Sequence, residues 1–79
     1  MTYIAERITI SDDLCGGKPT IRGMRISVET ILEFIGAGNS IEDILIAYPF
    51  LEHDDITACL QFASEMLKSK FGIMPKQII

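Results

Sequence analysis

The chain has few cysteines, a single histidine and no long hydrophobic run. Two cysteines, Cys15 and Cys59, are too few for a disulfide framework or for a four-ligand zinc site. The lone histidine, His53, has no clustered ligand beside it and is interpreted as an exposed turn residue. No stretch reaches the roughly 18 apolar residues that a membrane helix needs. We therefore expect no metal, no disulfide scaffold and no membrane association.

Basic residues are also scarce. Seven lysines and arginines face eleven aspartates and glutamates, which gives a net charge of −4. A free-standing nucleic-acid binder is usually basic, so this balance weighs against DNA as the main ligand, although a local basic patch remains open. The first seven residues lack the basic and apolar regions of a signal peptide, so we expect a cytoplasmic protein.

The size of the chain allows one domain. A chain of 79 residues buries only about 60–65% of its surface on folding, which gives marginal stability. Its hydrophobic content of 48% and charged content of 23% argue against disorder. A small interior with many apolar residues indicates that a second copy or a partner covers part of the surface.

Residue patterns divide the chain into a strand and hairpin arm (1–26), a three-helix bundle (27–71) and an apolar tail (72–79). Residues 7–10 alternate polar and apolar side chains, as a half-buried strand does. Gly23 interrupts two short extended pieces and predicts a tight turn. Ser27 and Ser40 are expected to cap the first two helices, and Asp43 to complete a capping box with Ser40.

The third helix is expected to begin near Asp54 and Asp55. It has the clearest amphipathic pattern in the chain, with an apolar stripe at helical spacing: Ile56, Cys59, Leu60, Ala63, Met66 and Leu67. Together these elements predict a mainly α fold in which a short strand and a hairpin precede three helices.

Two motifs carry a resemblance to a known family. Residues 16–28, GGKPTIRGMRISV, are followed by residues 38–45, GNSIEDIL, and by residues 48–51, YPFL. These strings resemble the signature of the family called domain of unknown function 433 (DUF433), over about residues 5–65. Met24 stands where that signature usually has threonine.

The resemblance implies a homeodomain-like helix-turn-helix fold and a frequent tendency to form dimers. It also implies a VapB-type antitoxin, a protein that inhibits a small PIN-like ribonuclease toxin encoded beside it. The expected partners are thus a second copy and a PIN-like toxin, with DNA as a weaker candidate and no small-molecule ligand or cofactor. A helix-turn-helix regulator that binds DNA and a dimeric adaptor without a toxin are the alternative functions.

The glycine-rich loop does not predict a nucleotide site. Gly16, Gly17, Lys18 and Pro19 lack the spacing of a phosphate-binding loop, and extended structure follows them instead of a helix. The expected role of the two glycines, Pro19 and Gly23 is to set the backbone conformation of the motif.

Charge is polarised along the chain. The first 25 residues carry a net charge of +1 and the rest −5. Lys18, Arg22 and Arg25 are candidates for binding a partner or nucleic acid, because arginine forms paired hydrogen bonds with phosphates and carboxylates. The alternative is that these cations pair with acids of the helices within the same chain.

The second and third helices could form a helix-turn-helix. The exposed face of the third would offer mainly polar side chains: Thr57, Gln61, Ser64, Glu65 and Lys68. Asp54 and Asp55 at its start would repel phosphates, which weighs against direct reading of DNA.

No pattern of catalytic nucleophile and base is present, so we expect no enzyme activity and no catalytic residue. Instead, aromatic and aliphatic side chains fall partly off the helical stripes. We interpret six of them as interface candidates: Phe34, Tyr48, Phe50, Leu51, Phe62 and Phe71.

Overall fold

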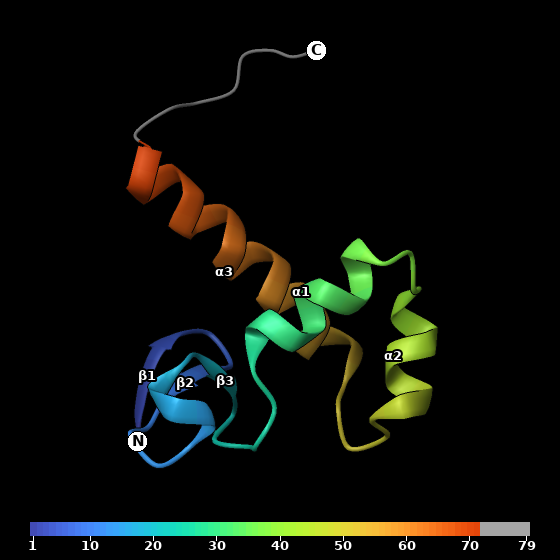
Figure 1. Ribbon diagram of the computed structural model, residues 1–79, viewed down its shortest axis with the longest axis horizontal. Helices are drawn as coiled ribbons and strands as arrows, with labels where there is room; N and C mark the ends of the chain where they lie inside the picture. Colours follow the sequence, from blue (N-terminus) through green and yellow to red (C-terminus); the bar gives the residue numbers. More distant parts are fainter. Residues whose placement is uncertain (72–79) are drawn as a thin grey trace.

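The computed structural model describes residues 1–71 as a small sheet followed by three helices (Figure 1). The elements are β1 (Thr2–Ala5), β2 (Ile8–Ile10), a short 3-10 turn η1 (Cys15–Gly17), β3 (Thr20–Ile21), α1 (Val28–Gly36), α2 (Ile41–Ala47) and α3 (His53–Phe71). The expected mainly α fold with an N-terminal strand and hairpin arm is confirmed. The predicted tail 72–79 lies outside the described residues.

The sheet is antiparallel, with strand order β1-β2-β3. The strand expected at residues 7–10 is confirmed as β2, which begins at Ile8, while Arg7 lies in the turn before it. Strand β1 could not be predicted, because all four of its side chains are exposed and it joins the sheet through its backbone. A strand without a buried face has no hydrophobic alternation to detect.

A tight turn connects β3 to the segment that leads into α1, as Gly23 predicts. Both central residues have left-handed backbones, with φ of 46° at Arg22 and 72° at Gly23. The Met24 N–H donates to the Ile21 carbonyl at 2.8 Å, which closes a turn of type I′. The Gly23 N–H donates to the buried Thr9 hydroxyl at 2.9 Å, so the turn is held against β2.

Side chains cap the first two helices where the sequence predicts. The Ser27 hydroxyl accepts a hydrogen bond from the Thr30 N–H at 3.1 Å. At α2 the Ser40 hydroxyl accepts from the Asp43 N–H, and the Asp43 carboxylate accepts from the Ser40 N–H, both at 3.0 Å. These caps satisfy N–H groups that have no partner inside the helix. α3 begins at His53, so this residue opens the helix instead of lying in a turn.

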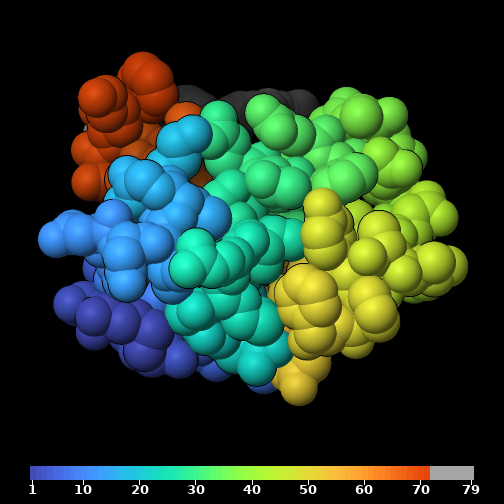
Figure 2. All heavy atoms as spheres, turned by 60° about the horizontal axis from the view of Figure 1, so that its bottom comes forward, coloured from blue at the N-terminus to red at the C-terminus, as the bar shows by residue number. Residues whose placement is uncertain are grey.

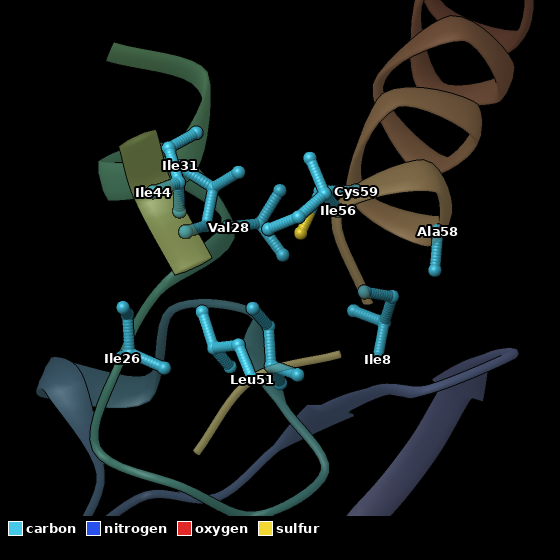
Figure 3. Packing of buried hydrophobic residues seen from close by; sticks show 10 residues of the cluster. Ile8, Ile26, Val28, Ile31, Ile44, Leu51, Ile56, Ala58 and Cys59 are labelled. Atoms are coloured by element: carbon cyan, nitrogen blue, oxygen red, sulfur yellow. The ribbon is translucent and has the colours of Figure 1, made fainter. Parts of the chain in front are cut away.

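The core lies where the sheet, α1, α2 and the first turns of α3 meet (Figure 3). It is built mainly from β-branched and other aliphatic side chains: Ile8, Ile21, Ile26, Val28, Ile31, Ile44, Leu51, Ile56, Ala58 and Cys59. Leu51 is only 6% exposed. Its expected role as an interface residue is therefore corrected: the segment between α2 and α3 turns this side chain inward.

The apolar stripe of α3 is buried only in part. Ile56 and Cys59 are fully buried, whereas Leu60, Met66 and Leu67 are 40%, 53% and 59% exposed. A helix of 19 residues is about 28 Å long. Its last turns project past the sheet and α1 (Figure 1). None of the helices within residues 1–71 combines the length and apolar character of a membrane crossing.

Candidate functional site

The three basic candidates of the glycine-rich motif have different surroundings. Lys18 pairs with Glu29 of α1 at 2.9 Å, and both side chains are exposed. The hydrogen bond that the Lys18 ammonium donates to the Glu29 carboxylate raises the pKa of Lys18. Arg22 pairs with Asp55 of α3, and Arg25 is exposed. The alternative of pairing within the chain thus holds for Lys18 and Arg22.

Asp55 is the centre of an ionic cluster that joins the sheet to α3. The Arg22 Nε and Nη2 atoms donate to its two carboxylate oxygens at 2.9 and 2.8 Å. The Arg7 Nη1 atom donates to Asp55 at 2.9 Å and to Glu52 at 2.7 Å. The Glu52 N–H also donates to Asp55 at 2.8 Å. We call Arg7, Arg22, Glu52 and Asp55 the Asp55 cluster.

Backbone turns place both arginines of the cluster. Arg7 and Arg22 have left-handed backbones, with φ of 66° and 46°, at the turns that follow β1 and β3. Such angles are uncommon for residues other than glycine. Two ion pairs to one fully buried carboxylate offset this local strain. In Figure 2 the segment after β3 (teal) lies against the segment that leads into α3 (gold).

The environment of Asp55 favours its ionised form. Burial alone would raise the pKa of this carboxyl, but hydrogen bonds from Arg22, from the Glu52 N–H and from Arg7 outweigh burial and lower the pKa. Both oxygens are occupied by donors. A carboxylate held in this way joins the sheet to α3 and is not available as a general base.

We expect the stability of the protein to fall in acid because of Asp55. A lowered folded-state pKa means that the cluster stabilises the fold at neutral pH, and that this contribution is lost as pH drops below the ordinary aspartate range, about pH 4. Urea denaturation at a series of pH values would measure it. The Asp54→Asn variant should keep the acid dependence and Asp55→Asn should lose much of it; the same dependence in both variants would refute the assignment.

The sequence did not reveal the Asp55 cluster. From the sequence, Asp55 has the position of an acid that stabilises the dipole at a helix start, and Arg7 begins the alternating pattern of a strand. The two residues are 48 positions apart, so no local spacing connects them. Of the three motif cations, only Arg25 forms no ion pair with another of residues 1–71.

A row of three aromatic rings forms a different surface, beside α1 and α2. The Phe34 and Tyr48 rings meet edge to face with centroids 5.8 Å apart, and Tyr48 meets Phe50 in the same way at 6.0 Å. Phe34 and Tyr48 are half-buried, while Phe50 is 55% exposed. We call these three residues the aromatic row. A hollow of about 350 Å³ adjoins it, with Glu33 in its lining.

The remaining interface candidates separate by exposure. Phe62 is half-buried and packs against the core. Phe71 is 63% exposed at the end of α3. The sequence missed Ile46, which is 78% exposed on the outward side of α2 and was not among the candidates.

The described residues show no arrangement typical of covalent or metal chemistry. Burial raises the pKa of the Cys59 thiol to about 12, and the charge of Asp55 adds to this effect, so the thiol stays neutral at physiological pH. No group of three metal-ligating side chains lies together within residues 1–71.

Comparison with known proteins decides the family. The sequence pattern of the family described as "Protein of unknown function (DUF433)" matches residues 8–63, most of the chain. This protein belongs to the DUF433 family. The match covers the glycine-rich motif, the Asp55 cluster except Arg7, and the aromatic row.

Two relatives support this assignment. An uncharacterized protein, y4eO, of Sinorhizobium fredii (strain NBRC 101917 / NGR234) is 39% identical over 75 residues, which cover 90% of this chain. The chain spans about a third (34%) of the length of that relative. The crystal structure of a DUF433 member from Anabaena variabilis ATCC 29413 superposes with a TM-score of 0.73 at 28% identity, covering 80% of this chain and 62% of the other.

Proposed function

We propose that this DUF433 protein is the antitoxin of a type II toxin–antitoxin pair, and that it binds and inhibits a PIN-like ribonuclease. The observation that carries the proposal is the aromatic row with its acidic surroundings. Exposed aromatic side chains are the residues that most often dominate binding energy at protein interfaces. Phe50 presents such a side chain. Its ring packs against Tyr48, and Tyr48 packs against Phe34.

Acidic side chains on α1 and α2 fit a basic partner. Glu33 lines the adjoining hollow, and Glu42 and Asp43 occupy the exposed first turn of α2. A nuclease that holds RNA needs positive charge around its active site, and opposite charge speeds the encounter of two proteins. In the proposed complex the acidic surface occupies the path of the RNA, and the aromatic row holds the two proteins together.

The basic motif has a narrower role in this proposal than the sequence indicated. Arg22 forms an ion pair with Asp55, and Lys18 forms one with Glu29. Arg25 is exposed and is the motif cation that can reach an acidic metal pocket of a nuclease, or operator DNA within the complex. Autoregulation of the operon is part of the proposal through this residue.

The proposal is tested by co-expressing the protein with a PIN-like ribonuclease encoded beside it. We expect a stoichiometric complex that suppresses RNA cleavage. Phe50→Ala should weaken the complex roughly 30-fold, as loss of an aromatic anchor does. Leu67→Ala is the matched control, because Leu67 is 59% exposed on α3, away from the aromatic row, and should leave inhibition unchanged. Absence of both binding and inhibition by the wild-type protein would end the antitoxin proposal.

A second candidate function is a helix-turn-helix regulator that binds DNA directly. In its favour, the five polar residues expected on the outer face of α3 are all exposed. Against it, Glu52 and Asp54 at the start of α3 are 61% and 76% exposed and would repel phosphates. Tight, salt-sensitive binding of the isolated protein to its own promoter would favour this candidate over the first.

A further inference from the structure

The hollow beside the aromatic row is formed by one face of α1 and by the residues that flank α2. Its volume of about 350 Å³ lies in the range of roughly 300–1,000 Å³ that is typical of sites for small ligands. The contributions of α1 recur at spacings of three and four residues, which puts them on the same side of the helix. Six residues line the hollow: Thr30, Glu33, Phe34, Ala37, Asn39 and Tyr48.

Glu33 gives the hollow a negative charge. It forms no ion pair with any of residues 1–71. Glu29, one helical turn earlier on α1, pairs with Lys18 at 2.9 Å. The pKa of Lys18 is raised mainly by this hydrogen bond to Glu29, and Glu33 adds only a smaller effect from a longer range. Of these two neighbouring acids of α1, Glu33 is therefore the one whose carboxylate is open to a cation from another molecule.

The other polar features of the hollow also suit a positive charge. Ala37 is the C-cap of α1, at the negative end of the helix dipole, and the last turn of α1 has no basic residue. The Asn39 Nδ2 atom donates to the Phe34 carbonyl at 3.1 Å, which leaves the amide oxygen of Asn39 as an acceptor. None of the six described residues that line the hollow is basic. A cationic group would thus meet hydrogen-bond acceptors and a negative potential.

Two aromatic rings favour a guanidinium over other cations. Phe34 and Tyr48 are half-buried and hold each other edge to face, at an interplanar angle of 70°. A planar guanidinium stacks on the face of an aromatic ring while its N–H groups donate to a carboxylate. A lysine ammonium is more strongly hydrated and has no flat face to stack. Because Glu33 lines the same hollow as both rings, one arginine side chain can make both kinds of contact.

We propose that this hollow binds one arginine side chain of the partner protein, which stacks on the aromatic row and donates hydrogen bonds to Glu33. That the partner is a PIN-like ribonuclease rests on the proposed function, whereas the site for arginine does not depend on it. Exposed arginines are among the residues with which proteins hold the phosphates of RNA. An arginine bound in the hollow is withdrawn from the RNA, so the contact inhibits the ribonuclease as well as binding it.

Nuclear magnetic resonance of the isotope-labelled full chain tests the site without a ribonuclease. The probe is N-acetyl-L-arginine amide, and its control is N-acetyl-L-citrulline amide, which has nearly the same shape but no charge. We expect the arginine probe to shift the amide signals of Glu33, Phe34 and Asn39 in a saturable way at millimolar concentration. The citrulline probe should bind at least roughly 10-fold more weakly, because it loses the charge-assisted hydrogen bonds.

Three variants locate the contact. Glu33→Gln should weaken binding of the arginine probe roughly 10-fold, because glutamine keeps the size of the side chain and loses its charge. Tyr48→Leu should weaken it about threefold, because leucine offers no ring face. The matched control is Glu65→Gln on α3, which removes the same charge from a side chain that is 74% exposed and should leave binding unchanged. Signals that move only near each substitution show that the variant is folded.

Absence of a saturable shift, or equal binding by the wild-type protein and Glu33→Gln, would overturn the proposal. Shifts spread over all the acidic side chains would also overturn it, because they would show a general attraction of positive charge. Co-purification with the ribonuclease separates this proposal from the antitoxin function. A complex that Glu33→Gln does not weaken would refute the arginine site and leave the antitoxin function standing. Binding of the probe without any complex would refute the antitoxin function and leave the arginine site standing.

Discussion

The Asp55→Asn variant is expected to be less stable than the wild-type protein by about 3 kcal/mol, which is a large part of the roughly 4–12 kcal/mol that a domain of this size has. The side chain is fully buried and receives four hydrogen bonds. Asparagine keeps the shape but removes the charge, and its amide NH₂ group cannot accept the hydrogen bonds that one carboxylate oxygen accepted. Arg22 then faces a neutral group in a partly buried site.

Urea or thermal denaturation at neutral pH measures this loss. The matched control is Asp54→Asn at the neighbouring residue. Asp54 is 76% exposed, and its ion pair with Arg7 is long, at 3.8 Å. Its effect should stay within about 0.5 kcal/mol, as for most exposed substitutions. Equal losses in the two variants would show that Asp55 has no special role in holding the sheet to α3.

The Leu51→Ala variant is expected to lose about 3 kcal/mol of stability, because it leaves a cavity in the core between the sheet and the helices. Leu51 is 6% exposed and belongs to the buried cluster. Figure 3 shows it among the core side chains. Small domains have few such residues, so one truncation removes a large share of the total.

The adjacent Phe50→Ala is the control for Leu51→Ala. Phe50 is 55% exposed and contacts Tyr48 only at the ring edge, so its loss should cost less than about 1 kcal/mol. The free energies of unfolding of the two variants, measured side by side, separate a core residue from a surface residue one position apart. Similar losses of stability in the two variants would contradict the assignment of Leu51 to the core and Phe50 to the surface.

Burial could not be predicted from the sequence for two pairs of neighbouring residues, Phe50 and Leu51, and Asp54 and Asp55. Leu51 and Phe50 are both apolar residues in a short connection after Pro49, with no helical period to tell which one points inward. Asp54 and Asp55 both have the composition of a helix start. In each pair the burial depends on how the connection from α2 to α3 meets the sheet, and this is a property of the assembled fold.

Local chemistry was enough to predict most of the elements. The caps at Ser27 and Ser40, the turn at Gly23 and the buried stripe at Ile56 and Cys59 follow from interactions between residues that are close in sequence. The motifs at residues 16–28, 38–45 and 48–51 predicted the DUF433 family, which the comparisons confirm. Fold class and family were thus determined by the sequence itself.

Only the tertiary structure decided what the motif cations and the end of α3 do. Arg22 of the motif pairs with an acid 33 residues away, and Arg7 with one 48 residues away, because the turns after β1 and β3 bring both to the start of α3. The apolar stripe of α3 predicted one buried face along the whole helix. The helix extends beyond the rest of the domain, so Leu67 on that stripe is exposed. Charge pairing and burial depend on distances between segments remote in sequence, and these distances are fixed only when the chain is folded.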